Sequence, residues 1–238
     1  MAKHALLNNV EHKGMRIITR RSAALGDDVM SALVIPAEFR HVQAHYPIVF
    51  QKRTDTGQFQ PLALFGFEQR ENLFLTSAGW DVPYVPLSIE RQPFLIGGGH
   101  GQPGGAPQLV VHIDLDSPRV SAVEGEPVFL EYGGSTGYLN RVSAVLHALH
   151  QGLEAIPAFV AALLEHELLE SFVLDVALKD GSQNRLSGFY TVNEDKLRAL
   201  DGEAIKSLHA KGYLEAVFMV VASTVHFRDL IDRRNRRL

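Results

Sequence analysis

The stretch PVFLEYGGSTGYLNRVSAVLHALH, residues 127–150, contains the change of pattern that decides the fold. Its first six residues, PVFLEY, form a short apolar run typical of a β-strand, and GGSTG then supplies a turn. From Tyr138 onward, apolar residues recur three and four positions apart, as they do on one face of an α-helix. The stretch therefore predicts a strand, a turn and a long helical region, in that order.

The residues before this stretch are rich in strand signals. Turn sequences such as TDTGQ, SAGWD and GGGHGQPGG separate short apolar or alternating runs. One short helix is predicted from Pro36 to Ala44, because proline suits a first helical turn and a second proline follows at Pro47. The predicted strands are MRIITR (15–20), YPIVF (46–50), QPLALFGF (60–67), ENLFL (71–75), QLVVHIDL (108–115) and PVFLEY (127–132).

Helical patterns dominate the residues after this stretch. Residues 138–169 predict two helices, because Pro157 favours the start of a second helix over the middle of one. A β-hairpin is predicted from Phe172 to Val192, with Asp180 and Gly181 at its turn. Three more helices are predicted: two capped by Asn193 and Asp201, and a last one that begins at Tyr213 and frays into an arginine-rich tail, RDLIDRRNRRL.

These elements predict an α+β fold. Regular helices do not separate the strands, which argues against a doubly wound parallel sheet. We expect a mostly antiparallel sheet with helices packed on one side, and a helical C-terminal half containing one β-hairpin. The covering helices are predicted at residues 138–169 and 213–230. We predict a single domain over residues 1–238, strand-rich from 15 to 132 and helix-rich from 136 to 230.

Composition narrows the classes of function. The 238 residues are 46% hydrophobic and 21% charged, as in an ordinary soluble globular protein. The net charge of −4 does not favour a nucleic-acid partner. The absence of cysteine excludes disulfide scaffolds, cysteine nucleophiles and cysteine-ligated clusters. No run approaches the about 20 apolar residues of a membrane span, and no signal-peptide core is recognised, so we expect no membrane span and a cytoplasmic location.

His112 and Asp114 form a His-x-Asp pair on a predicted strand, where alternate side chains share a face. Such a pair opens the two-His-one-carboxylate site of non-haem iron oxygenases that use 2-oxoglutarate. His226 and Arg236 follow in a suitable order, but His226 lies in a predicted helix and few strands follow the pair. The favoured interpretation is an edge-strand histidine beside acids that end the strand.

Ser135 lies at the centre of GGSTG, residues 133–137, which matches the G-x-S-x-G pattern of a nucleophile elbow. A predicted strand precedes it and a predicted helix follows, as a serine hydrolase requires. The elbow of that class nevertheless belongs to a parallel sheet, whereas an antiparallel hairpin is predicted here. The favoured alternative is a glycine turn in which Ser135 or Thr136 caps the following helix.

An aromatic and proline-rich segment, GWDVPYVPLSIERQPFL, spans residues 79–95. Its three prolines restrict the backbone, which predicts a rigid, irregular segment lined by aromatic rings. Such surfaces suit extended peptide ligands, although packing into the core is the simpler interpretation. Within this segment Trp80, Tyr84 and Arg91 are the candidate ligand contacts, and Arg91 is the candidate partner for a carboxylate.

Four longer stretches together resemble the bacterial SapC family. They are YPIVFQKRTDTGQFQPLALFGFEQRENLF (46–74), YVPLSIERQPFLI (84–96), HIDLDSP (112–118) and LKDGSQNRLSGFYTVNEDKLRALDGEAIKSLHAKGYLEAVF (178–218). The resemblance runs from about Pro36 to Phe227. The family is named from a surface-layer gene cluster and its members are often labelled peptide-transport proteins, which implies a role in a peptide-related uptake or modification system.

The resemblance also bears on the two catalytic motifs. The recurring portion of the family pattern corresponds to Ile113, Asp114, Ser117 and Pro118, whereas the positions of His112 and Ser135 are not fixed in it. This implies that Asp114 and Ser117 belong to a strand end and turn in which a side chain accepts hydrogen bonds from backbone N–H groups.

We therefore expect a non-catalytic accessory or binding protein with no cofactor and with a peptide or protein partner; whether it forms a homo-oligomer stays open. The alternatives are an iron and 2-oxoglutarate oxygenase that uses His112 and Asp114, and a serine hydrolase that uses Ser135. The expected ligand-binding residues are Trp80, Tyr84, Arg91 and Asp114.

Overall fold

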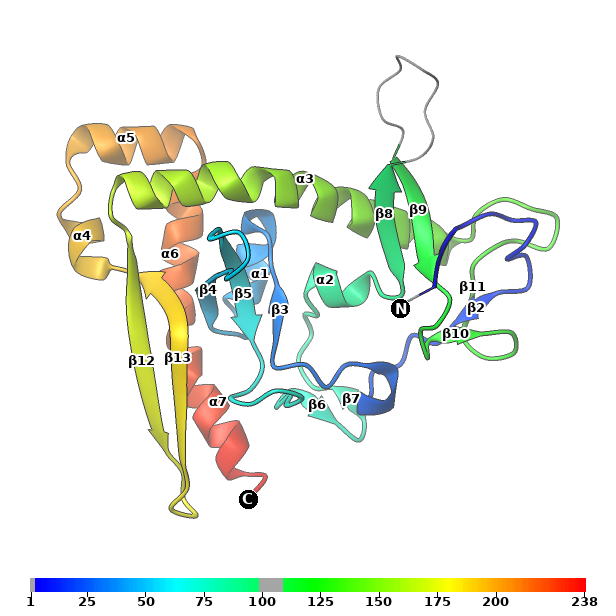
Figure 1. Cartoon of the computed structure of the whole chain (residues 1–238), viewed down its shortest axis with the longest axis horizontal. Coiled ribbons are helices and arrows are strands. Elements are labelled where there is room, and N and C mark those ends of the chain that lie inside the picture. Colours follow the sequence, from blue (N-terminus) through cyan, green and yellow to red (C-terminus); the bar gives the residue numbers. More distant parts are fainter. Residues whose placement is uncertain (1–2, 99–108) are drawn as a thin grey trace. The chain divides into compact units, whose positions relative to one another are not determined.

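The computed structural model describes residues 3–98 and 109–238 (Figure 1). The chain forms two compact units: unit 1 comprises Met1–Asp27 and Leu87–Gln151, and unit 2 comprises Asp28–Pro86 and Gly152–Leu238. Strand pairing within the described ranges is antiparallel, and helices accompany the sheets in both units. The α+β prediction is confirmed. The single domain predicted for residues 1–238 stays a prediction.

Unit 1 holds two small sheets and the first part of the longest helix. One sheet has the order β1 (His4–Leu6), β9 (Leu109–Asp114), β8 (Phe94–Gly98); the other has the order β10 (Val120–Ser121), β2 (Arg16–Ile17), β11 (Glu126–Pro127). Two short helices, η1 (Ala23–Leu25) and α2 (Leu87–Glu90), and the start of α3 (Gly137–Glu165) complete it. Its core is apolar because the buried faces of strands and helix meet there: Ile17, Phe94, Ile113, Val128, Leu139, Val142 and Leu146.

Unit 2 is built on a five-stranded sheet with the order β12 (Leu169–Ala177), β13 (Gln183–Val192), β4 (Ile48–Lys52), β5 (Phe59–Leu64), β3 (Ser31–Leu33). A small hairpin joins β6 (Leu75–Thr76) to β7 (Gly79–Trp80). Helix α6 contacts β13 and β4, and Ser223 Oγ accepts a hydrogen bond from the Ile48 N–H at 2.9 Å. The other helices are η2 (Pro36–Glu38), α1 (Phe39–Val42), α4 (Glu194–Arg198), α5 (Gly202–Ala210), α6 (Tyr213–Ser223) and α7 (His226–Asn235).

The predicted hairpin and helix caps are confirmed. β12 and β13 pair along their lengths and turn through Asp180 and Gly181. The side chain of Asn193 accepts a hydrogen bond from the Lys196 N–H at 2.9 Å, and that of Asp201 accepts one from the Ala204 N–H at 2.8 Å. These features depend on residues close in sequence, which is why local patterns predict them.

The prediction of two helices across residues 138–169 is wrong. α3 is one helix, Gly137–Glu165, and Pro157 lies inside it. Pro157 has no N–H to donate to the Leu153 carbonyl, which normally weakens a helix. Leu153 is 44% exposed, so water can hydrate the freed carbonyl. The neighbouring Ile156, Phe159 and Val160 are buried, and their packing keeps the helix continuous.

Two predicted strands are also largely absent. In ENLFL, the Asn72 side chain accepts a hydrogen bond from the Phe74 N–H at 2.9 Å, which folds a turn, and β6 begins only at Leu75. In PVFLEY, β11 ends at Pro127 and the chain reverses through Gly133 and Gly134, both with φ of +90°. The predicted GGGHGQPGG loop spans residues 97–105, of which 99–105 lie outside the described residues.

The C-terminal tail is not frayed, contrary to the prediction. It forms α7, whose Arg233 pairs with Asp81 at 2.6 Å and whose Arg234 pairs with Glu71. Beyond the helix, Arg237 donates to the Leu75 carbonyl at 2.7 Å. These acids and carbonyls precede the tail by more than 150 residues in sequence, so no local pattern indicates them.

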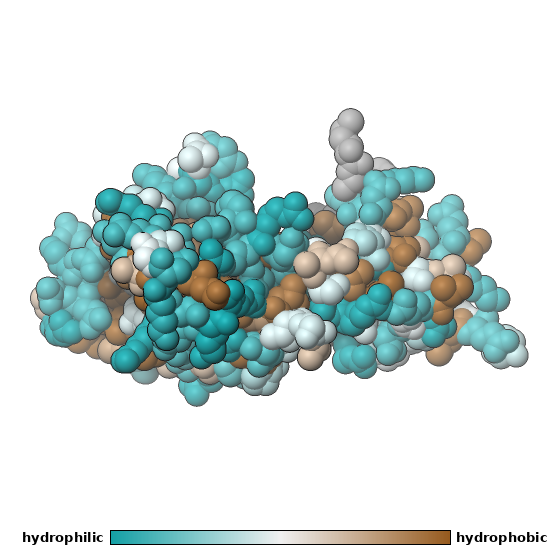
Figure 2. All heavy atoms as spheres, turned by 90° about the horizontal axis from the view of Figure 1, so that it is seen from below, coloured by the Kyte–Doolittle hydropathy of each residue, from teal (hydrophilic) through white to brown (hydrophobic). Residues whose placement is uncertain are grey.

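Both hydrophilic and hydrophobic side chains reach the surface. The side of the molecule seen in Figure 2 is mainly hydrophilic, with hydrophobic side chains in small separate patches. Scattered exposed apolar residues are normal for a folded protein. Among the described residues, no helix combines the length and apolar character needed to cross a membrane.

We predict that Gly152→Ala destabilises unit 2, although alanine favours a helix by about 1 kcal/mol over glycine. A Cβ on Gly152 would lie 2.4 Å from Cδ1 of Ile35, which is only 1% exposed. Overpacking of this kind costs about 1–3 kcal/mol, so the free energy of unfolding should fall in urea denaturation. Gly202→Ala, at the first residue of helix α5 with nothing near its Cβ, should leave it unchanged or raise it by at most about 1 kcal/mol. If Gly152→Ala remains as destabilising in an Ile35→Ala background, this contact is not the cause.

Candidate ligand-binding pocket

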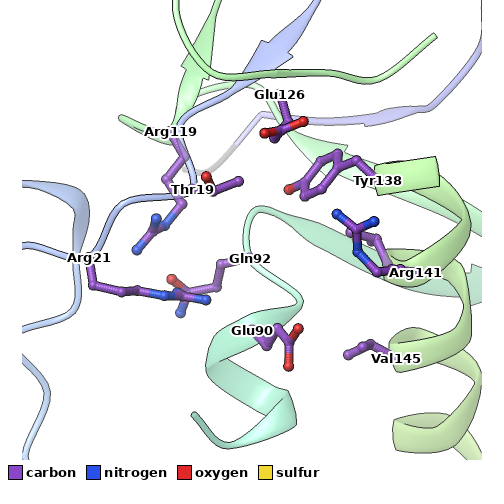
Figure 3. A pocket seen from close by; sticks show the side chains of 10 residues that line it. Thr19, Arg21, Glu90, Gln92, Arg119, Glu126, Tyr138, Arg141 and Val145 are labelled. Atoms are coloured by element: carbon purple, nitrogen blue, oxygen red, sulfur yellow. The ribbon is translucent and has the colours of Figure 1, made fainter. Parts of the chain in front are cut away.

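A pocket of about 280 Å³ lies within unit 1 (Figure 3). Helix α3 contributes Tyr138, Arg141 and Val145 from its first turns, because residues three and four apart share a helix face. The remaining wall comes from the segment after β2, from the end of α2 and the residues after it, from the turn after β9 and from β11. The polar side chains that line the pocket are Thr19, Arg21, Glu90, Gln92, Arg119, Glu126, Tyr138 and Arg141.

The start of α3 is held in place by Thr136. Its Oγ1 accepts a hydrogen bond from the Leu139 N–H at 3.2 Å, which confirms the predicted cap at one of the two proposed positions. The same hydroxyl lies 2.8 Å from the Pro127 carbonyl, to which it donates. β11 and the first turn of α3 are therefore tied together, and Glu126 of β11 and Tyr138 of α3 line the same pocket.

Arg119 and Asp27 form a buried ion pair behind the pocket. Arg119 is 1% exposed and Asp27 is fully buried. Arg119 Nη2 donates to Asp27 Oδ1 at 2.6 Å, and Nη1 donates to the carbonyls of Ile18 and Arg20 at 3.1 and 3.0 Å. Burial lowers the pKa of Arg119 and Asp27 opposes this effect, but a guanidinium stays charged at neutral pH.

The Arg119 side chain is not fully satisfied by the chain. Its Nε is buried and has no hydrogen-bond acceptor among residues 3–98 and 109–238. Arg21 adds a second guanidinium, with Nη1 at 3.3 Å from both Asp27 Oδ1 and the Ile89 carbonyl. Buried polar groups without a partner are rare in folded proteins, and this one belongs to a side chain that lines the pocket.

Tyr138 remains protonated in this setting. Burial raises the pKa of Tyr138 to about 12. The positive charges of Arg21, Arg119 and Arg141 oppose this rise, and the negative charge of Glu126 adds to it. At neutral pH its hydroxyl is therefore a hydrogen-bond donor. That hydroxyl makes no hydrogen bond to any part of the chain that the structure describes.

Arg141, Glu90 and Glu126 line the pocket as charged side chains without ion pairs in the described ranges. In Figure 3 the Arg141 guanidinium lies beside the Tyr138 ring, Glu126 lies on the other side of that ring, and Glu90 projects from α2. The pocket therefore presents positively and negatively charged side chains that do not pair with one another.

The predicted contacts Trp80 and Tyr84 lie in unit 2, where they bond within the chain. Trp80 Nε1 donates to Tyr46 Oη at 2.7 Å, and Tyr84 Oη donates to Glu38 Oε2 at 2.7 Å. The Tyr84 ring stacks on His41, with ring centroids 5.2 Å apart. Their role in ligand binding stays a prediction.

Arg91 and Asp114 belong to unit 1. Arg91 Nη1 donates to the Phe94 carbonyl at 2.7 Å, and burial lowers the pKa of Arg91. Asp114 Oδ1 accepts a hydrogen bond from the Asp116 N–H at 3.1 Å, and Ser117 Oγ accepts one from the Arg119 N–H at 3.3 Å. The expected strand end and turn is confirmed, while ligand binding by Arg91 and Asp114 stays a prediction.

His112 does not lie on an edge strand, contrary to the prediction. β9 is the central strand of its sheet, and His112 pairs with Leu6 of β1 and with Leu95 of β8. His226, the third ligand weighed for an iron site with Asp114, belongs to unit 2; its Nδ1 lies 2.6 Å from Asp229 Oδ2 and its Nε2 lies 2.9 Å from the Gln43 carbonyl. Within residues 3–98 and 109–238, no three His, Asp or Glu side chains gather as metal ligands would.

Ser135 occupies a different local structure from a nucleophile elbow. It is exposed and forms an antiparallel bridge with Phe129, directly before the Thr136 cap. An elbow requires a parallel strand that leads through the serine into a helix. GGSTG here closes a tight reversal and starts α3.

Sequence reasoning did not identify this pocket. No local motif marks four of the lining residues, Arg21, Glu126, Tyr138 and Arg141. Only tertiary contacts bring them to one pocket. The available signals were Arg119, which directly follows Ser117 and Pro118 of the motif that carried the family resemblance, and Glu90 and Gln92, which lie in another stretch that carried it, YVPLSIERQPFLI (84–96).

The fold and the pocket define an α+β protein with a small pocket, lined by charged side chains, in one of its two units. A family model described as SapC matches residues 7–230, and the chain belongs to the SapC family. No curated protein matches the chain. No solved structure matches it either.

We predict that Asp27→Asn destabilises the protein by about 3–5 kcal/mol, because it removes the charge that compensates buried Arg119. Urea denaturation followed by circular dichroism measures the change. The control is Asp175→Asn, which breaks an ion pair with Arg185 whose side chains are 67% and 72% exposed. That change should cost less than about 1 kcal/mol. Equal losses in the two variants would show that burial of the Arg119–Asp27 pair has no special effect.

Proposed function

We propose that this SapC family member is a non-catalytic binding protein that holds a small carboxylate-bearing ligand in the unit 1 pocket. The observation that carries the proposal is the Arg141 guanidinium, which forms no ion pair with the described residues and lies beside Tyr138 in a pocket of about 280 Å³. A guanidinium recognises a carboxylate through two parallel hydrogen bonds, and a phenolic hydroxyl supplies a third donor.

The size and chemistry of the pocket support binding of a small ligand. Pockets for drug-sized molecules span roughly 300–1,000 Å³, so this one suits a ligand at or below that range. The guanidinium groups of Arg21, Arg119 and Arg141 donate hydrogen bonds, and so does the Tyr138 hydroxyl, whose pKa burial raises to about 12. Four hydrogen-bond donor groups in the lining of one pocket favour the binding of an anionic group.

The family supports a peptide-related role. The SapC resemblance implies a peptide uptake or modification system, and the C-terminus of a peptide is a carboxylate. We propose a cytoplasmic accessory protein with a peptide or peptide-handling protein as its partner, acting without a cofactor.

We predict that the dipeptide N-acetyl-Ala-Ala binds in isothermal titration calorimetry at millimolar concentration, whereas N-acetyl-Ala-Ala-amide, which lacks the carboxylate, does not. Arg141→Ala should weaken binding at least about tenfold, since charge-assisted hydrogen bonds contribute about 1.5–3 kcal/mol. Arg141→Lys should give an intermediate affinity, because lysine keeps the charge and loses the two-pronged geometry.

Arg185→Ala provides the matched control. Arg185 is an exposed arginine of unit 2, on β13 and away from the lining of the pocket, and its loss should leave affinity unchanged. Equal binding of the acid and the amide, or full affinity in Arg141→Ala, contradicts the proposed site.

A further inference from the structure

The unit 1 pocket contains carboxylates as well as guanidinium groups. Glu126 and Glu90 line it together with Arg141, and none of the three forms an ion pair in the part of the chain that the structure describes. All three side chains are exposed to solvent, so a ligand can reach them without breaking an ion pair. Their separation leaves a place for a ligand that carries both signs of charge.

The charges of the pocket balance overall. Three guanidinium groups, on Arg21, Arg119 and Arg141, face three carboxylates when the buried Asp27 is included with Glu90 and Glu126. Asp27 already engages Arg119 and Arg21. A simple dianion such as phosphate would meet Glu126 and Glu90 as like charges, and like charges brought together disfavour binding. A ligand with one positive and one negative group meets no such penalty.

The arrangement of Glu126 and Arg141 is fixed by backbone structure. Glu126 begins β11 and Arg141 lies in the first turns of α3, and Thr136 joins these elements through its hydrogen bond to the Pro127 carbonyl. Tyr138 stands between them in Figure 3, with Glu126 on one side of its ring and Arg141 on the other. A carboxylate and a guanidinium are thus held on opposite sides of the Tyr138 ring.

We infer that the pocket binds a zwitterion, a free α-amino acid or short peptide whose carboxylate meets Arg141 and Tyr138 and whose ammonium group meets Glu126. This inference rests on the proposed function and adds a second requirement to it, a free amino group. The ammonium group has three donors and no acceptor, so a carboxylate is its natural partner, and Glu126 provides one without losing another ion pair.

The test compares two ligands that differ only at the amino end, Ala-Ala and N-acetyl-Ala-Ala, by isothermal titration calorimetry at neutral pH. The wild-type protein should bind Ala-Ala about tenfold more tightly, the fold-change that one charge-assisted contact supplies. Glu126→Gln should reduce the affinity for Ala-Ala to that for N-acetyl-Ala-Ala and should leave the latter unchanged. Glu131→Gln, a change at an exposed glutamate outside the lining of the pocket, is the matched control and should keep the preference.

The outcomes separate the two proposals. If N-acetyl-Ala-Ala binds as tightly as Ala-Ala, the zwitterion inference is wrong while carboxylate binding stands. If neither ligand binds, the proposed function fails and the inference fails with it. If Glu90→Gln abolishes the preference and Glu126→Gln does not, the assignment of the ammonium site is overturned. A circular dichroism melt of each variant confirms that the fold is intact, as expected for substitutions of exposed side chains.

Discussion

The buried ion pair between Arg119 and Asp27 is the constraint on which the structure of unit 1 depends. It joins positions 92 residues apart, and Arg119 also donates to two backbone carbonyls after β2. A buried pair of this kind contributes little net stability over an apolar pair, but the loss of either partner leaves a charge without compensation. The pair therefore specifies which segments lie together: the turn after β9, the chain after β2 and the end of the N-terminal segment.

The pocket follows from this arrangement. Asp27 engages Arg119 and Arg21, whereas the Arg141 guanidinium, which α3 presents beside Tyr138 and Val145, has no ion pair among residues 3–98 and 109–238. Thr136 fixes where α3 begins and links it to β11. A rigid pocket reduces the ordering cost of binding, which matters for a small ligand that makes few contacts.

Unit 2 uses other means to hold its elements together. Arginines of α7 and of the residues after it bind acids and a carbonyl in the segment from Glu71 to Asp81. α3 packs closely against Ile35 because residue 152 is glycine. Trp80 and Tyr84, singled out as an aromatic surface, satisfy their polar groups with Tyr46 and Glu38. Aromatic residues in an irregular, proline-rich segment thus serve here to anchor that segment within the unit.

The sequence by itself determined the features whose causes are local: the α+β class, a hairpin predicted from Phe172 to Val192, the caps at Asn193 and Asp201, a cap at Ser135 or Thr136, and the turn after Asp114. Side-chain periodicity and hydrogen bonds between near neighbours specify these, and both can be read along the chain. Only the tertiary structure decided that α3 continues through Pro157, that the C-terminal arginines are paired, and that Arg119, Glu126, Tyr138 and Arg141 line one pocket. Each of these depends on packing or charge contacts between residues far apart in sequence, and such contacts leave no periodic signal in it.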